Sequence, residues 1–116
     1  MRLRHIATVL FAALLFAALL AGCATVDVTK TGKGFYDKTN PNDVDILKTR
    51  PERSYEELGT VTAAGFAPDE TAKMHNAIRS KSAALGANAV ILTEEGIIAG
   101  GWGPKKWATG VAIRYK

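Results

Sequence analysis

Cys23 is the only cysteine among the 116 residues of the chain, and it directly follows an apolar run that ends in the letters LLAG. The thiolate of cysteine is a nucleophile, so this side chain can take up a group on its sulfur. A disulfide within the chain needs a second cysteine and is therefore excluded. The chemistry to explain is a reaction of one thiol at one place near the N-terminus.

The segment before Cys23 has the composition of an export signal. Residues 1–5 form a short basic head, and residues 6–20 contain no charged residue. That run is too short for a membrane-spanning helix, which needs roughly 20 apolar residues. Ala21 and Gly22 are the small residues that a signal peptidase requires beside the bond it cuts. We therefore predict that residues 1–22 are removed as a signal peptide.

The four residues Leu20-Ala21-Gly22-Cys23 resemble the lipobox of bacterial lipoproteins, which has leucine, a small residue, glycine or alanine, and then cysteine. The resemblance implies that Cys23 carries a thioether-linked diacylglycerol, becomes the new N-terminus and is N-acylated. Several acyl chains on one residue give stable anchoring, whereas one chain binds a membrane only marginally. The alternatives are a buried cysteine, or an ordinary secretory signal followed by an incidental thiol.

The expected location follows from the same segment. Residue 24 is alanine rather than the aspartate that resembles an inner-membrane retention signal, so we expect an outer-membrane lipoprotein with its domain in the periplasm. Loss of Arg2 and Arg4 leaves 13 basic and 11 acidic residues, a net charge of about +2, and gives no reason to expect a nucleic-acid partner. The expected partners are the membrane, an envelope protein and a second copy of the chain.

Other candidate chemistry is weak. Gly32-Lys33-Gly34 lacks the remaining spacing of a phosphate-binding loop. His75 is the only histidine after signal removal, so with Cys23 acylated no metal-ligand set and no cofactor beyond the covalent lipid are expected. Glu94 and Glu95 are adjacent and could form a catalytic carboxylate pair. Adjacent extended residues point to opposite sides, however, so a solvated turn is expected instead. We therefore do not expect an enzyme.

The chain divides into the signal peptide (1–22), the acylated cysteine with a flexible tether (23–42), and a small domain (43–116). Phe35 and Tyr36 are expected to dock the end of the tether onto the domain. Within the domain, periodicity and glycine or proline breaks predict two strands, one helix that Pro68 opens and Gly86 ends, and two further strands. The expected ranges are 44–48, 55–64, 68–85, 88–93 and 107–115. This is an α+β fold, a ββαββ domain with one helix across a mixed or antiparallel sheet.

Two features suggest further contacts. The run at residues 89–92 is apolar without alternation, which is typical of a strand covered on both faces, here by the helix and by a partner subunit. A domain this small without disulfide or metal buries a thin core, so marginal stability or oligomerisation is expected.

The segment GGWGPKKW at residues 100–107, in a predicted glycine-rich turn over 96–103, is the candidate contact loop. Tryptophan is enriched at binding hot spots, so Trp102 and Trp107 are contact candidates. Lys105 and Lys106 beside them suit an acidic partner, lipid headgroups or a glycan. The alternative is a hairpin in which Trp102 folds back over the sheet.

Two segments carry a second resemblance. YEELGTV at residues 55–61 is similar to a Y-x-x-L-G-x-V strand, and IRSKSAALGANAVI at residues 78–91 is similar to an A-x-x-LGA-(N/D)-A-V-I junction. Together they resemble the small α/β domains of the RcsF and YbjQ-like group, several of which are exported lipoproteins. The resemblance implies a non-enzymatic interaction or envelope-sensing module. A small-ligand or cell-wall-binding module, assembled as an oligomer, is the alternative.

Overall fold

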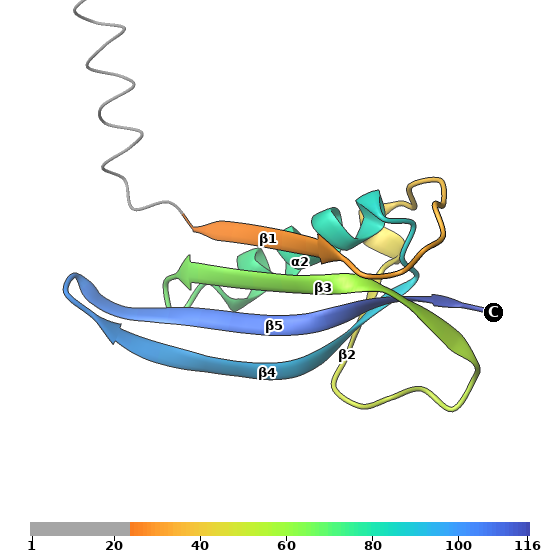
Figure 1. The fold of residues 1–116 in the computed structure, drawn as a ribbon. Helices are drawn as coiled ribbons and strands as arrows, with labels where there is room; N and C mark the ends of the chain where they lie inside the picture. The colour runs from red at the N-terminus through yellow and green to blue at the C-terminus, as the bar shows by residue number, and fades with distance from the viewer. Residues whose placement is uncertain (1–23) are drawn as a thin grey trace, which may run out of the picture.

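The computed structural model describes residues 24–116, which form a five-stranded sheet with one α-helix packed on one face (Figure 1). The elements in chain order are β1 (Thr25–Lys30), the 3-10 helix η1 (Pro41–Asp43), β2 (Asp45–Leu47), β3 (Tyr55–Phe66), α2 (Thr71–Ala84), β4 (Ala89–Gly100) and β5 (Gly103–Tyr115). The strand order is β1-β3-β5-β4-β2, and only β2 and β4 pair in parallel. The predicted α+β fold is confirmed. The predicted signal peptide and the predicted acylation site, Cys23, lie outside the described residues.

The sheet has one strand more than expected, because β1 lies in the segment predicted to be a tether. It pairs with β3 along its whole length, from Thr25 opposite Ala64 to Lys30 opposite Gly59. Val26 and Val28 pack against the core while the residues between them are exposed. This period-2 alternation is the ordinary pattern of a half-buried strand. The prediction of a flexible tether over residues 23–42 is therefore wrong for the residues of β1. The order of strands and helix is βββαββ.

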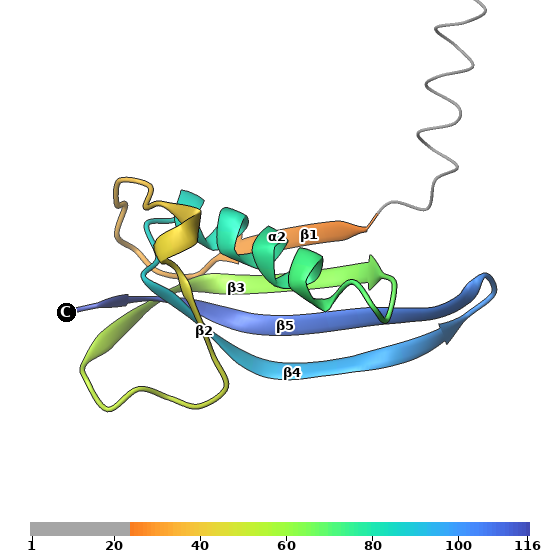
Figure 2. The ribbon, with the colours of Figure 1, turned by 180° about the vertical axis from the view of Figure 1, so that it is seen from behind.

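The helix lies over one face of the sheet (Figure 2), and this is the face on which small side chains of β5 are buried. On β5 the buried residues Ala108 and Ala112 belong to the same core cluster as Met74 and Ile78 of α2, both of which have no exposed surface. Small side chains on the strand allow a helix to pack close to it. Met74 and Ile78, which are four residues apart, therefore lie on the core face of α2.

The opposite face of the sheet is buried at one end by the chain itself. Ala89, Ile91 and Ile113 form a second buried cluster. The partly buried residues packed against it are Leu47, Tyr55, Val111 and Tyr115. The continuous apolar run of β4 is thus buried on both faces by residues of the chain itself, while the expected second copy stays a prediction.

Gly86 ends α2 in the left-handed conformation that the sequence predicted, with φ +86°. A Cβ atom at this position would lie 2.6 Å from the Cβ of Tyr36. Tyr36 packs against the core, donates a hydrogen bond from its hydroxyl group to Glu56, and has the Arg114 guanidinium 4.5 Å from its ring centroid. The predicted docking is confirmed for Tyr36 and wrong for Phe35, which is 87% exposed.

We predict that Gly86→Ala lowers the free energy of unfolding by about 1–3 kcal/mol, because alanine is strained at this positive φ and its Cβ would overlap Tyr36. Urea denaturation followed by circular dichroism measures the change. Gly101→Ala is the control, since a Cβ there meets no atom within 4 Å. Equal midpoints for the two variants would contradict the prediction.

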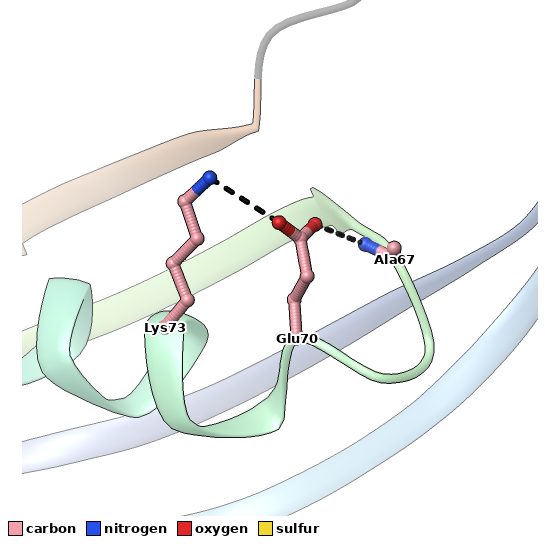
Figure 3. Close-up of polar contacts among 3 residues, drawn as sticks. All are labelled: Ala67, Glu70 and Lys73. Atoms are coloured by element: carbon pink, nitrogen blue, oxygen red, sulfur yellow. Dashed lines mark hydrogen bonds and ion pairs between the residues drawn. The ribbon is translucent and has the colours of Figure 1, made fainter.

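The helix begins at Thr71, later than predicted, because Pro68 and Asp69 form a turn that closes onto Glu70 (Figure 3). One carboxylate oxygen of Glu70 accepts the Ala67 N–H at 2.8 Å, and the other accepts from Lys73 Nζ at 3.2 Å. The Ala67 hydrogen bond, followed by Lys73, lowers the pKa of Glu70 below its usual 4.5. The charged form of Glu70 therefore stabilises the start of α2.

A lowered carboxyl pKa contributes stability that is present above the unfolded-state pKa and lost as the pH falls through the folded-state pKa. We predict that Glu70→Gln lowers stability at neutral pH and makes its decrease below about pH 4.5 shallower. Thermal unfolding over a pH series measures both effects. Glu52→Gln removes the same charge in the loop before β3, and a matching change in that variant would argue against a specific role of Glu70.

Candidate functional site

The β4–β5 hairpin projects beyond the rest of the sheet (Figures 1 and 2). Pairing of β3 with β5 extends only to Phe66 opposite Lys106, and pairing of β2 with β4 covers only residues 89–91. The strands continue to Gly100 opposite Gly103. Residues 96–107, here called the distal hairpin, thus form an arm whose outer part is two-stranded.

The glycine-rich turn expected over residues 96–103 is much shorter in the structure. β4 runs to Gly100, and only Gly101 and Trp102 form the turn. The β-branched pair Ile97-Ile98 explains the extension, because such residues favour strands and here pair with Lys106 and Lys105. Pairing with β5 therefore outweighs the preference of the flanking glycines for a turn.

Three large apolar side chains of the distal hairpin face solvent. Trp102 is 99% exposed, and Ile97 and Ile98 are 58% and 59% exposed. The alternative in which Trp102 folds back over the sheet is therefore wrong. Ile97 and Ile98 are adjacent in a strand and lie on opposite faces, so the arm is apolar on both sides.

The other predicted contact residues have different roles. Lys105 is partly exposed near the tip, opposite Ile98. Lys106 donates a hydrogen bond to Thr71 Oγ1 at 2.8 Å and so fastens the arm to the start of α2. Trp107 lies against Gly96 of the paired strand, where a Cβ would be 3.0 Å from its indole nitrogen. The arm thus has a tip with Trp102 and Lys105 and a base secured by Lys106 and Trp107.

Ile97 and Ile98 are not among the contact residues predicted from the sequence, yet both are exposed in β4. Two adjacent β-branched residues next to a turn suggest a strand, but the glycines around them were given more weight. A strand with apolar residues on both faces is ordinarily a buried one, so the sequence alone would have placed this pair in a core.

The two glutamates lie in β4 rather than in a turn. A β-bulge between Leu92 and Glu94 shifts the register, so that Glu94 is opposite Thr109 and Glu95 is opposite the buried Ala108. The two carboxylates therefore point to opposite faces, and Glu95 lies on the side of α2.

His75 lies on α2 beside Glu95. Its Nε2 atom is 4.0 Å from Glu95 Oε2 and, within residues 24–116, is buried with no hydrogen-bond partner. Burial lowers the pKa of His75 below 6.5, against the opposing effect of Glu95, while Arg79, Lys106 and Lys48 lower it further. The imidazole is therefore neutral at pH 7.

We predict that Glu95→Gln lowers the pKa of His75 further, because it removes the carboxylate that favours the protonated ring. Proton NMR titration of the imidazole signals measures this pKa in the mature protein. Glu94→Gln, which changes the carboxylate on the other face, should leave it nearly unchanged. A rise in the pKa on removing Glu95 would show that the two groups do not interact in this way.

A lowered histidine pKa also affects stability. The unfolded chain binds a proton more readily than the folded one, so stability is lost as the pH falls from the unfolded-state value near 6.5 through the folded-state pKa.

Neither a metal-binding cluster nor a membrane-spanning helix is found in the part of the chain that the structure describes. It contains no group of three or more histidine, cysteine or acidic residues placed to hold a metal ion, and no helix with the length and apolarity to cross a bilayer.

Comparison with known proteins supports the fold alone. No family model matches the chain, and no curated protein matches it. Among solved structures, the chain is similar to the Francisella virulence factor FvfA in its orthorhombic crystal form, with a TM-score of 0.57 at 9% sequence identity. The alignment covers 78% of this chain and 98% of the other. At this identity the similarity establishes a shared arrangement of strands and helix.

Proposed function

We propose that this chain is an outer-membrane lipoprotein that acts by binding rather than by catalysis, as an interaction or envelope-sensing module. The distal hairpin is its contact surface. The observation that carries this proposal is the complete exposure of Trp102 at the end of a β-hairpin. The lipobox-like residues before Cys23 support the lipid anchor, because they place the cysteine in the one register that the motif requires.

The form of the arm supports a role in binding. Exposing a tryptophan to water forfeits the large apolar contribution that this side chain makes when buried. Strand pairing holds the arm in one conformation, so that less conformational entropy is lost when a partner binds. Exposed apolar residues gathered on one projection mark an interaction site more often than scattered ones do.

The position of His75 favours binding over catalysis. Its Nε2 atom is buried between α2 and β4, 4.0 Å from Glu95 Oε2. A general base needs a substrate proton within hydrogen-bond reach. A buried nitrogen without a partner is poorly placed for that task, so we assign His75 a packing role.

A second candidate function, small-ligand or cell-wall binding by an oligomer, has one observation in its favour. On the helix-free face, one row of cross-strand pairs runs from Asp27 through Thr62 and Thr109 to Glu94. The two threonine hydroxyl groups are 3.1 Å apart. A flat row of hydroxyl groups between two carboxylates offers hydrogen bonds of the kind that bind a sugar chain.

The proposed contact surface can be tested by thiol accessibility in cells. Acylation consumes the thiol of Cys23, so a cysteine introduced at residue 101, beside Trp102, is the only free thiol of the mature protein. Gly101→Cys leaves Trp102 in place, and its Cβ meets no atom within 4 Å. We predict that this thiol reacts at least about ten-fold more slowly with a maleimide in intact cells than in the purified protein, because an occupied surface excludes the reagent.

Ser80→Cys, at an exposed position on α2, is the matched control and should react equally in cells and in purified form. Both variants should react fully after denaturation. Equal reactivity of the thiols at residues 101 and 80 in cells would rule out the distal hairpin as an occupied surface.

A further inference from the structure

The proposed lipid lies very close to the folded domain. Cys23 precedes Thr25, the first residue of β1, by only two positions. Consecutive Cα atoms are about 3.8 Å apart, so the Cα of Cys23 lies within about 7–8 Å of the Cα of Thr25. An anchored Cys23 therefore holds the end of β1 at the membrane surface, with no tether between them.

The distal hairpin projects from the same end of the domain. Val26 of β1 is opposite Ala63 of β3, which is opposite Ala108 of β5, so these residues form one row across the sheet. Figures 1 and 2 both show β1 beginning on the side toward which the hairpin extends. The anchored end and the tip thus point in the same direction.

The tip reaches at least as far as the anchor does. Trp102 is six residues beyond Ala108. At about 3.3 Å per residue, the tip therefore lies roughly 20 Å past the row of paired residues that joins Val26 to Ala108. Cys23 is three residues beyond Val26 and reaches about 11 Å past it at most. The strands β1 and β5 are separated by β3 alone, which corresponds to a lateral distance of about 10 Å. A bilayer that holds Cys23 is therefore within reach of Trp102.

The chemistry of the arm suits a lipid surface. Ile97, Ile98 and Trp102 are exposed, and residues 96–107 contain two lysines and no acidic residue. Tryptophan is enriched at membrane–water interfaces because its ring is apolar while its N–H can form hydrogen bonds. Lysine is attracted to anionic headgroups.

The acidic groups nearest to the arm lie behind its tip. Glu94 and Glu95 precede the distal hairpin along β4. Phe66 is opposite Lys106 at the base of the arm. Asp69 and Glu70 lie in the turn that follows Phe66. Glu70 is paired with Lys73. The part of the arm that reaches farthest is therefore apolar and cationic, which complements an anionic bilayer.

We infer that the distal hairpin inserts its tip into the headgroup region of the bilayer that holds Cys23. This inference rests on the proposed lipid anchor and names the partner of the proposed contact surface. The anchor makes insertion intramolecular, so a weak affinity of the arm for lipid suffices to keep it in place. The domain is then held at two points, the acylated Cys23 and Trp102, and it has one orientation relative to the membrane.

Fluorescence quenching by brominated lipids tests the insertion. The lipidated full-length mature protein is reconstituted into vesicles of phosphatidylethanolamine and phosphatidylglycerol, with bromine on the acyl carbons nearest the headgroups. The chain has two tryptophans, so Trp107→Phe leaves Trp102 as the reporter, and Trp102→Phe leaves Trp107. We expect Trp102 fluorescence to fall roughly two-fold, since interfacial side chains lie about 5–10 Å into the headgroup and acyl boundary.

Trp107 lies against Gly96 at the base of the arm and should be quenched far less. Circular dichroism verifies that both variants are folded. Trp107→Tyr, which keeps an aromatic ring beside Gly96, gives the same measurement with Trp102 as the sole tryptophan if Trp107→Phe does not fold. In that variant quenching should come with a blue shift of the emission, which reports the tip.

The outcomes separate the two proposals. Mass spectrometry of the N-terminal peptide reports the acyl groups, and their absence overturns the lipid anchor and with it the insertion. If the acyl groups are present and Trp102 is not quenched, insertion is overturned while the anchor stands. Protection of the thiol at residue 101 in cells without quenching of Trp102 in vesicles would assign the arm to a protein partner instead.

Discussion

The antiparallel pairing of β4 with β5 is the interaction on which the rest of the structure depends. It runs from Ala89 opposite Ile113 to Gly100 opposite Gly103. Its first half supplies the centre of both buried clusters, and its second half carries the exposed arm. One hydrogen-bonded ladder therefore joins the core to the candidate contact surface, so the position of the tip is set by the core.

The bulge in β4 decides which side chains face the helix. In regular alternation Glu94 would share a face with Leu92, which packs in the core beneath α2. The extra residue at the bulge moves Glu94 to the helix-free face and puts Glu95 beside His75. It also sets which isoleucine of the arm lies on each side, because every later residue follows the shifted register.

The short distance between Cys23 and β1 bears on the proposed lipid anchor. A long tether would let the domain reach partners far from a membrane. If Cys23 is acylated as proposed, a strand that begins at Thr25 keeps the domain at the membrane surface, with its projecting arm on the same side as Cys23 (Figure 1). In the proposed arrangement the chain's C-terminal end faces away from the bilayer, where an envelope partner could reach it (Figure 1).

The amino-acid sequence determined the helix face through Met74 and Ile78, the end of the helix at Gly86, and the apolar run of β4, because each rests on local periodicity or backbone conformation. It also carries the lipobox-like residues at Cys23, which the structure does not describe. Tertiary structure decided the rest. β1 became a strand because β3 offered it an edge, and residues 96–100 stayed extended because β5 pairs with them. The exposure of Trp102 also depends on tertiary structure, since it is set by where the neighbouring strands end. Strand pairing between distant segments leaves no local signal in the sequence.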